Sequence, residues 1–250
     1  MDLFKTRISA LKRTVVLDCD EVLVEISPRA LEIMHIKEAD FFSKYLRLVD
    51  DFNLEQMTPL ITSRPTYYLN EWLMRKEIAE DDDLHDSYKE ECIPRMLDLF
   101  ARDDFYEGLM PTTLAATVIR MLRAGTISKA IVVTKVTDYS KEGIASKERF
   151  LKGIFSGLMD RVDIYYLPAT SESKKSEVIN SLPQDVQDDI AFFADDHIEN
   201  IVDVLENTDL TDYQLLVPSY GYNSDIEAIN QTLLRQKKAE LLFYSPATEE

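Results

Sequence analysis

Two aspartates, Asp18 and Asp20, stand one residue apart directly after the apolar run Val15-Val16-Leu17. Side chains alternate in an extended chain, so both carboxylates emerge on the same face, on the order of 7 Å apart along the backbone. Two like charges at this spacing are unfavourable unless a proton or a cation lies between them. Mg2+ prefers oxygen ligands of this kind, so the pair predicts a metal site at a strand end. A strand that simply enters an acidic loop would give the same pattern.

A second acidic pair repeats this layout. Asp195 and Asp196 follow the apolar run 190–194. In parallel α/β sheets, ligands bind beyond the carboxyl ends of the strands, near the point where the strand order reverses. Two acidic strand ends that are distant in sequence can therefore converge on one ion, and together they favour a metal site. His197 comes next, but an oxygen-rich site in a chain with three histidines favours carboxylate ligands.

Composition and charge restrict the class of protein. The 250 residues carry a formal net charge of -18, with 45% hydrophobic and 30% charged residues. Such an acidic chain would repel duplex nucleic acid. No apolar run approaches the ~20 residues that span a bilayer. Cys19 and Cys92 are the only cysteines; without a secretory signal they favour the cytoplasm, and we expect Cys19 to be a small buried side chain facing away from the two aspartates.

The remaining pattern indicates strands that alternate with helices. Helical spacing of apolar residues covers 112–124, before Gly125, and also covers 142–155. Alternation of this kind predicts a parallel sheet with helices on both faces. A further helix is expected at 225–238, before a frayed end at 245–250. The expected strands are 14–18, 129–134, 162–167, 189–194 and 213–217.

The stretch 28–105 breaks the alternation, because it is rich in large apolar and charged residues and contains no convincing strand. We interpret it as a helical insertion after the first strand. The expected division is therefore an α/β core at 1–27 and 106–250 and a helical cap at 28–105. The aromatic residues of the insertion either stack on a substrate or form the cap's own core; they are Phe41, Phe42, Tyr45, Tyr67, Tyr68 and Trp72.

Four short motifs, in order over about 14–201, resemble those of the haloacid dehalogenase-like (HAD) superfamily of phosphotransferases. The family's Asp-x-Asp motif matches Asp18-Cys19-Asp20, and its strand ending in Thr or Ser matches Thr134. Its lysine at a helix start matches Lys174-Lys175, and its acidic pair matches Asp195-Asp196. The resemblance implies a Rossmann-like parallel sheet, which is the HAD-like core, with a helical cap inserted after the first strand. The segment 146–151 is also similar to the 5'(3')-deoxyribonucleotidase branch.

The resemblance implies a Mg2+-dependent phosphomonoester hydrolase. Asp18 would be the nucleophile and Asp20 the general acid–base, with Thr134 and one of the two lysines binding the substrate phosphate. The metal would be held within the set Asp18, Asp20, Asp195 and Asp196. An acid at the second position of the first motif disfavours dehalogenation, because a halide leaves without a proton. A phosphotransferase or mutase, and a catalytically silent binding protein, remain as alternatives.

Helical spacing separates the two lysines. Lys175 shares one helical face with Val178, Ile179 and Leu182, whereas Lys174 is turned roughly 100° away. We therefore expect Lys175 to face the sheet. The expected substrate is a small phosphorylated metabolite such as a nucleoside monophosphate. Partners in the form of duplex nucleic acid or membrane are not expected, and the sequence leaves the oligomeric state open.

Overall fold

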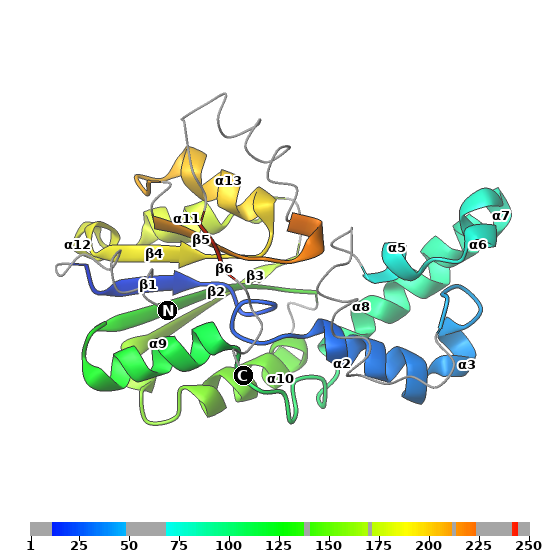
Figure 1. Ribbon diagram of the computed structural model, residues 1–250, viewed down its shortest axis with the longest axis horizontal. Coiled ribbons are helices and arrows are strands. Elements are labelled where there is room, and N and C mark those ends of the chain that lie inside the picture. Colours follow the sequence, from blue (N-terminus) through cyan, green and yellow to red (C-terminus); the bar gives the residue numbers. More distant parts are fainter. Residues whose placement is uncertain are drawn as a thin grey trace.

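Six strands, each parallel to its neighbours, form one sheet in the order β3-β2-β1-β4-β5-β6 (Figure 1). The computed structural model describes residues 12–48, 69–137, 141–169, 172–211, 214–223 and 242–244. The strands are β1 (Thr14–Leu17), β2 (Lys129–Val136), β3 (Val162–Pro168), β4 (Ile190–Ala194), β5 (Leu215–Pro218) and β6 (Leu242–Tyr244). The α/β fold class, the parallel sheet and the interior position of the first strand are confirmed. The edge strand β6 is additional to the five predicted strands.

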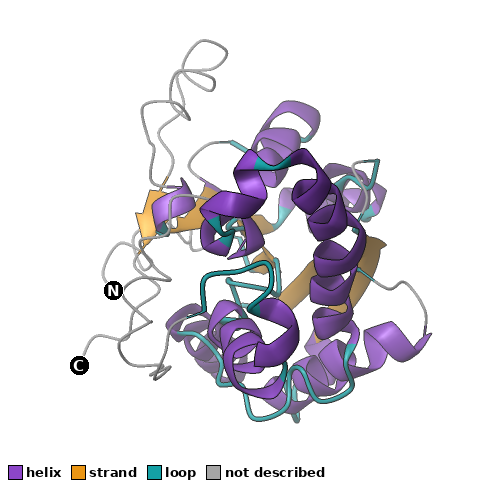
Figure 2. Cartoon of the chain, turned by 90° about the vertical axis from the view of Figure 1, so that its right-hand side faces the viewer, coloured by secondary structure: helices purple, strands orange, loops and turns teal. Residues whose placement is uncertain are grey.

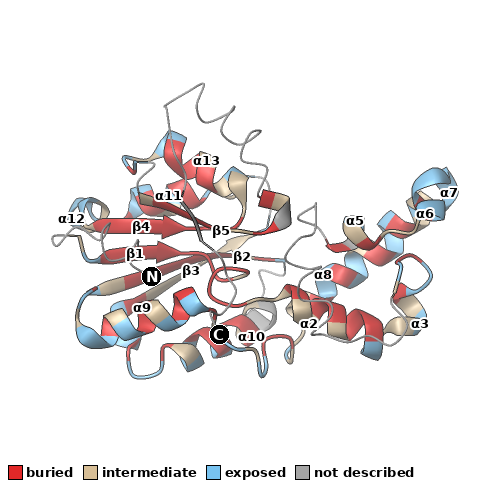
Figure 3. Cartoon of the chain, viewed as in Figure 1, coloured by how far each residue is buried: buried red, intermediate tan, exposed pale blue. Residues whose placement is uncertain are grey.

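Alternation along β1 explains how the sheet holds a helical layer on each face. Val15 and Leu17 belong to one apolar cluster, which includes residues of the helices below the sheet in Figure 1. Val16 belongs to a second cluster, with Ile179 and Val204 from the helices above it. All of these strand residues are buried, and Figure 3 shows the inner strands buried along their length. Near-continuous apolar runs such as Val15-Val16-Leu17 are therefore the expected sequence of this sheet.

The helices over the sheet are short and well delimited. α9 begins after Thr112, whose Oγ1 accepts a hydrogen bond from the Ala115 N–H at 3.2 Å, and it ends at Gly125, which has a φ of 69°. A positive φ is costly for residues with a Cβ, so glycine suits this position. The helices of the sheet layers are α9 (Thr113–Ala124), α10 (Lys141–Ile154), α11 (Lys175–Ser181), α12 (Gln184–Asp188) and α13 (Ile198–Asn207). The expected helix at 225–238 and the end at 245–250 lie outside the described residues.

Among the described residues, the segment between β1 and α9 consists of helices joined by loops, turns and isolated bridges, and its helices agree with the prediction. Its elements, here called the insertion helices, lie together beyond one end of the sheet (Figures 1 and 2). They are α2 (Ser27–Glu32), η1 (Ile33–Lys37), α3 (Ala39–Phe42), α5 (Leu69–Leu73), α6 (Lys76–Glu80), α7 (Asp82–Ser87), η2 (Tyr88–Cys92) and α8 (Ile93–Ala101). The division into core and cap at 28 and 105 stays a prediction.

The aromatic residues of the insertion pack mainly on one another. The Phe41 and Phe42 ring centroids are 5.1 Å apart, and the Tyr45 and Tyr88 centroids are 6.3 Å apart. Trp72 packs against the same apolar cluster. The interpretation as the cap's own core therefore holds for the described aromatics, whereas Tyr67 and Tyr68 lie outside the described residues. None of the described helices is long and apolar enough to cross a membrane.

Candidate active site

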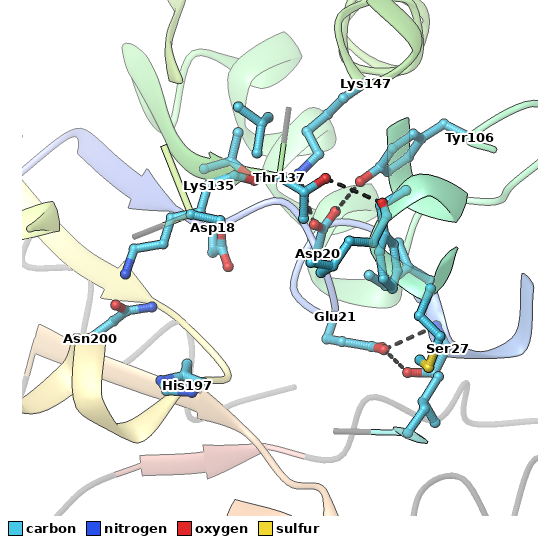
Figure 4. Close-up of a pocket in the computed structure, with 18 of the residues that line it drawn as sticks. Asp18, Asp20, Glu21, Ser27, Tyr106, Lys135, Thr137, Lys147, His197 and Asn200 are labelled. Atoms are coloured by element: carbon cyan, nitrogen blue, oxygen red, sulfur yellow. Dashed lines mark hydrogen bonds and ion pairs between the residues drawn. The ribbon is translucent and has the colours of Figure 1, made fainter. Parts of the chain in front are cut away.

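The strand order brings the predicted site residues to one edge of the sheet. β1 lies between β2 and β4, so the carboxyl ends of these three strands are adjacent. Asp18 directly follows β1, Thr134 lies near the end of β2, and Asp195 directly follows β4. The strand order reverses between β1 and β4, which is where parallel α/β sheets bind ligands. A cavity of about 600 Å³ opens there, with Asp18, Thr134 and Lys175 in its lining. Figure 4 shows Asp18 and Asp20 at this cavity.

Three carboxylates form a buried acidic cluster at this edge. Asp18, Asp195 and Asp196 each place one oxygen within 4.8 Å of the others. All three residues are buried. Burial, followed by repulsion from Asp195 and Asp18, raises the pKa of Asp196 well above its usual value of 3.8. Carboxylates this close together repel one another, so their ionised forms need cations nearby.

Lys175 supplies one such cation. Its Nζ lies 2.8 Å from Asp18 Oδ1 and 2.7 Å from Asp195 Oδ2, and its side chain is 1% exposed. Burial disfavours the ammonium, but the carboxylates of Asp18 and Asp195 outweigh burial and raise the pKa of Lys175. Lys174, by contrast, precedes the helix and is exposed. The helical spacing therefore predicted which of the two lysines faces the sheet.

Asp20 belongs to a second group of side chains, on the β2 side of the cavity. Its Oδ2 lies 2.7 Å from Lys147 Nζ, and its Oδ1 accepts a hydrogen bond from the Tyr106 hydroxyl at 2.7 Å (Figure 4). Lys147 Nζ also lies 3.1 Å from Thr134 Oγ1 and donates to the Lys135 carbonyl at 2.9 Å. The Asp20 carboxylate is thus separate from the acidic cluster. The ammonium group of Lys147 therefore contacts both the Asp20 carboxylate and the Thr134 hydroxyl.

A tight loop after β1 directs the carboxylates of Asp18 and Asp20 to different sides of the cavity. The Cys19 carbonyl accepts hydrogen bonds from the Leu23 and Val24 N–H groups at 2.7 and 3.1 Å. Glu21 has a φ of 58°, an uncommon conformation for a residue with a side chain. The Glu21 carboxylate accepts hydrogen bonds from both the N–H and the hydroxyl of Ser27, at the start of α2. Cys19 itself is fully buried, and burial raises the pKa of its thiol, in agreement with a packing role.

The second acidic pair is held by residues after it. Asp195 accepts hydrogen bonds from the His197 N–H at 2.9 Å and from the Asn200 amide at 3.1 Å. Asp196 Oδ2 accepts a hydrogen bond from the Tyr222 hydroxyl at 2.7 Å. His197 lines the cavity (Figure 4), and its main chain is what contacts Asp195. Each acid of the pair therefore has its own orienting partners.

Lys147 and Tyr106 are site residues that the sequence reasoning did not assign. A signal for Lys147 exists, because it falls on the apolar face of α10 at helical spacing with Ile144, Leu151 and Ile154. A lysine within such a stripe must be buried, and a buried lysine needs an anionic partner. Tyr106 has no comparable signal, since the approach of 103–111 to the loop after β1 depends on tertiary packing.

Comparisons with known proteins give matches to solved structures alone. No protein-family model matches the chain, and no curated protein does. One similar structure is a HAD-superfamily hydrolase, subfamily IA, variant 1, from Geobacter sulfurreducens; it is 15% identical, with a TM-score of 0.42 over 94% of this chain and 87% of that chain. Another is CbbY from Rhodobacter sphaeroides in complex with xylulose 1,5-bisphosphate; it is 14% identical, with a TM-score of 0.45 over 93% of each chain.

Proposed function

We propose that this protein is a Mg2+-dependent phosphomonoester hydrolase that works through a phosphorylated Asp18. The observation that carries the proposal is the convergence of three strand ends on one cavity. Two acids, a hydroxyl and two buried lysines meet there; they are Asp18, Asp20, Thr134, Lys147 and Lys175. The pattern of contacts is specific, because Lys147 pairs with Asp20 and Lys175 pairs with Asp18. Such an arrangement suits the transfer of a phosphoryl group to a carboxylate.

The chemistry proceeds in two steps. An Asp18 oxygen forms a bond to phosphorus while the bond from phosphorus to the ester oxygen breaks, and Asp20 gives its proton to that leaving oxygen. Water then attacks phosphorus and gives a proton to Asp20, and the bond between Asp18 and phosphorus breaks to release inorganic phosphate. Tyr106 and Lys147 hold Asp20 for both proton transfers. Thr134 would donate its hydroxyl proton to a phosphoryl oxygen.

The residues present fit a divalent cation. The buried cluster of Asp18, Asp195 and Asp196 holds three carboxylates, and Lys175 contacts two of them, Asp18 and Asp195. Asp196, without that lysine, is the acid whose ionised form gains most from a metal. Asp18, Asp196 and the main-chain carbonyl of Asp20 would hold Mg2+, and when bound it offsets the negative charge of the phosphoryl oxygens. Asp195 then orients Lys175.

A phosphate-release assay with small phosphomonoesters, including nucleoside monophosphates, tests the proposal. EDTA should eliminate release, and Mg2+ should restore it better than Ca2+, which prefers a larger and less regular oxygen shell. Asp18→Asn should abolish turnover without unfolding the chain. Asp160→Asn, at an exposed aspartate outside the cavity, should leave turnover unchanged. Near wild-type release by Asp18→Asn would show that Asp18 is not the nucleophile.

The role of Asp20 has a test of its own. A general acid matters most when the leaving group is a poor one, because a good leaving group departs without a proton. Asp20→Asn should slow hydrolysis of an alkyl phosphate by about 10²- to 10⁴-fold, which is the usual contribution of a general acid. In kcat/KM, which reports the first step, p-nitrophenyl phosphate should lose far less. Equal losses of kcat/KM on both substrates would show that Asp20 does not protonate the leaving oxygen.

A further inference from the structure

The cavity has two chemically different ends. Its lining lysines lie near the strand ends: Lys135 follows Thr134, while Lys147 and Lys175 contact Asp20 and Asp18. The opposite wall comes from the insertion helices and the loop before them, and most of its large side chains are apolar. They are Ile26, Leu69, Ile93, Met96, Leu97 and Phe100.

Helix α8 provides most of the apolar wall. Ile93, Met96, Leu97 and Phe100 recur at i, i+3, i+4 and i+7, which places them on one helical face. Ile93, Met96 and Phe100 pack against the apolar cluster that includes the insertion helices. Burial in the protein core therefore explains these three side chains, but not the fourth.

Leu97 is the residue that core packing leaves unexplained. It lies outside both apolar clusters and is 46% exposed, yet it lines the cavity. The Thr137 hydroxyl lies 3.5 Å from the Leu97 carbonyl, which connects this turn of α8 to the end of β2. A large aliphatic side chain held at the cavity surface gains free energy when an apolar group covers it.

The charges of the wall disfavour a second phosphate. Among the described lining residues, the insertion helices contribute no lysine, arginine or histidine, and their one charged side chain is Glu71. Glu199 adds a further acid to the lining. The described insertion helices therefore offer no cation to a second phosphate, and removing the hydration of a phosphate beside Ile93 and Leu97 is unfavourable.

We propose that the substrate is the monophosphate ester of an apolar alcohol, whose hydrocarbon part lies on Leu97 and its neighbours in α8. This inference rests on the proposed function, since it uses the lysine end of the cavity as the phosphate site. A cavity of about 600 Å³ accommodates a phosphate together with a six-membered ring. This proposal predicts that bisphosphates and polyhydroxylated sugar phosphates are poorer substrates.

A matched pair of esters tests the preference. Cyclohexylmethyl phosphate and glucose 6-phosphate both join a primary carbon on a six-membered ring to phosphate, so their leaving groups are similar and they differ chiefly in the ring hydroxyls. We expect kcat/KM to be at least about 10-fold higher for the cyclohexyl ester, the effect of one or more methylene groups in an apolar pocket. Fructose 1,6-bisphosphate should be poorer still. A preference for glucose 6-phosphate or for the bisphosphate overturns the inference.

Leu97→Ala tests whether the ring of the substrate lies against Leu97 on α8. This variant should lower the ratio of the two kcat/KM values by about 10-fold, because it removes the hydrocarbon that the ring covers. Leu84→Ala is the control: Leu84 lies on α7, is 43% exposed and does not line the cavity. Equal ratios for wild type, Leu97→Ala and Leu84→Ala would contradict the assignment of the wall.

Measuring binding without turnover distinguishes a failure of this inference from a failure of the proposed hydrolase activity. Calorimetry with two non-hydrolysable phosphonates, one carrying a cyclohexyl ring and the other a glucose-like ring, measures the preference without turnover. Tighter binding of the cyclohexyl phosphonate by about 10-fold supports the inference even if neither ester releases phosphate. The absence of turnover would then refute the hydrolase alone. Equal affinities, or no binding of either phosphonate, overturn the apolar site.

Discussion

Replacing Lys175 by methionine should destabilise the protein far more than the same change at Lys174. Both residues are lysines at the start of α11, so the two variants lose the same charge and gain the same side chain. Lys175 is 1% exposed and contacts two carboxylates, whereas Lys174 is exposed. The pair therefore isolates the effect of the buried contacts from the effect of net charge.

The magnitude follows from the two contacts of Lys175. At 2.8 Å from Asp18 and 2.7 Å from Asp195, each attraction is about 6 kcal/mol at an effective dielectric constant of about 20. The desolvation of the ammonium and of the carboxylates offsets most of this. Removing one member of a buried ion pair costs about 3–5 kcal/mol, because the remaining charge is left buried without a partner. Two carboxylates are left here, so we expect a loss near the upper end of that range.

Urea unfolding at neutral pH in the presence of EDTA measures the difference. The free energy of unfolding should fall by about 3–5 kcal/mol in Lys175→Met and by about 0.5 kcal/mol or less in Lys174→Met, as for ordinary surface changes. Mg2+ should recover more stability in Lys175→Met than in wild type, because the acidic cluster then lacks its lysine. Comparable losses in the two variants would refute the reasoning that Lys175 neutralises the cluster.

Three further predictions concern other groups. Lys147→Met should lower kcat by about 10²-fold or more, by releasing Asp20, whereas Lys152→Met, at a 56% exposed position of the same helix, should leave phosphate release unchanged. Tyr106→Phe should lower kcat by about 10-fold, equivalent to one hydrogen bond of roughly 1.5 kcal/mol, with no change in KM; an unchanged kcat would contradict it. Burial lowers the pKa of His35 below 6.5, so stability from the neutral ring is complete above pH 6.5 and is lost as the pH falls through the lower, folded-state pKa. His35→Asn should therefore lose less stability than wild type between pH 8 and pH 5 in urea unfolding, and an equal loss would contradict this.

The parts of the fold that could be predicted are those that the local spacing of apolar residues indicates. The run Val15-Val16-Leu17 is apolar at every position because β1 is covered on both faces, and such a run indicates a buried parallel strand. The position of Lys175 was predictable for a similar reason, since helical spacing places it on the face of Ile179, which is buried. In both cases the neighbours along the chain contain the information.

The parts that could not be predicted depend on contacts between distant segments. β6 has three residues, Leu-Phe-Tyr, and among the described residues it pairs with β5 alone. An apolar run this short fits the end of a helix or a loop as well as a strand. The hydrogen bond of Tyr106 to Asp20 joins segments 86 residues apart. The direction of the Asp20 carboxylate follows from the loop conformation at Glu21, whose φ of 58° carries no signal in the residue type.

Local charge would allow this acidic protein to hold the proposed phosphate. The chain carries a net charge of -18, yet the four acids around the strand ends, Asp18, Asp20, Asp195 and Asp196, stand beside three lysines. Their charges leave one negative charge in excess, and a bound divalent cation would reverse the sign of the local field. Burial strengthens this effect, because charges inside the protein are screened less than those on its surface. A negative net charge and the proposed phosphate site are therefore compatible, provided that Lys147 and Lys175 remain paired with Asp20 and Asp18.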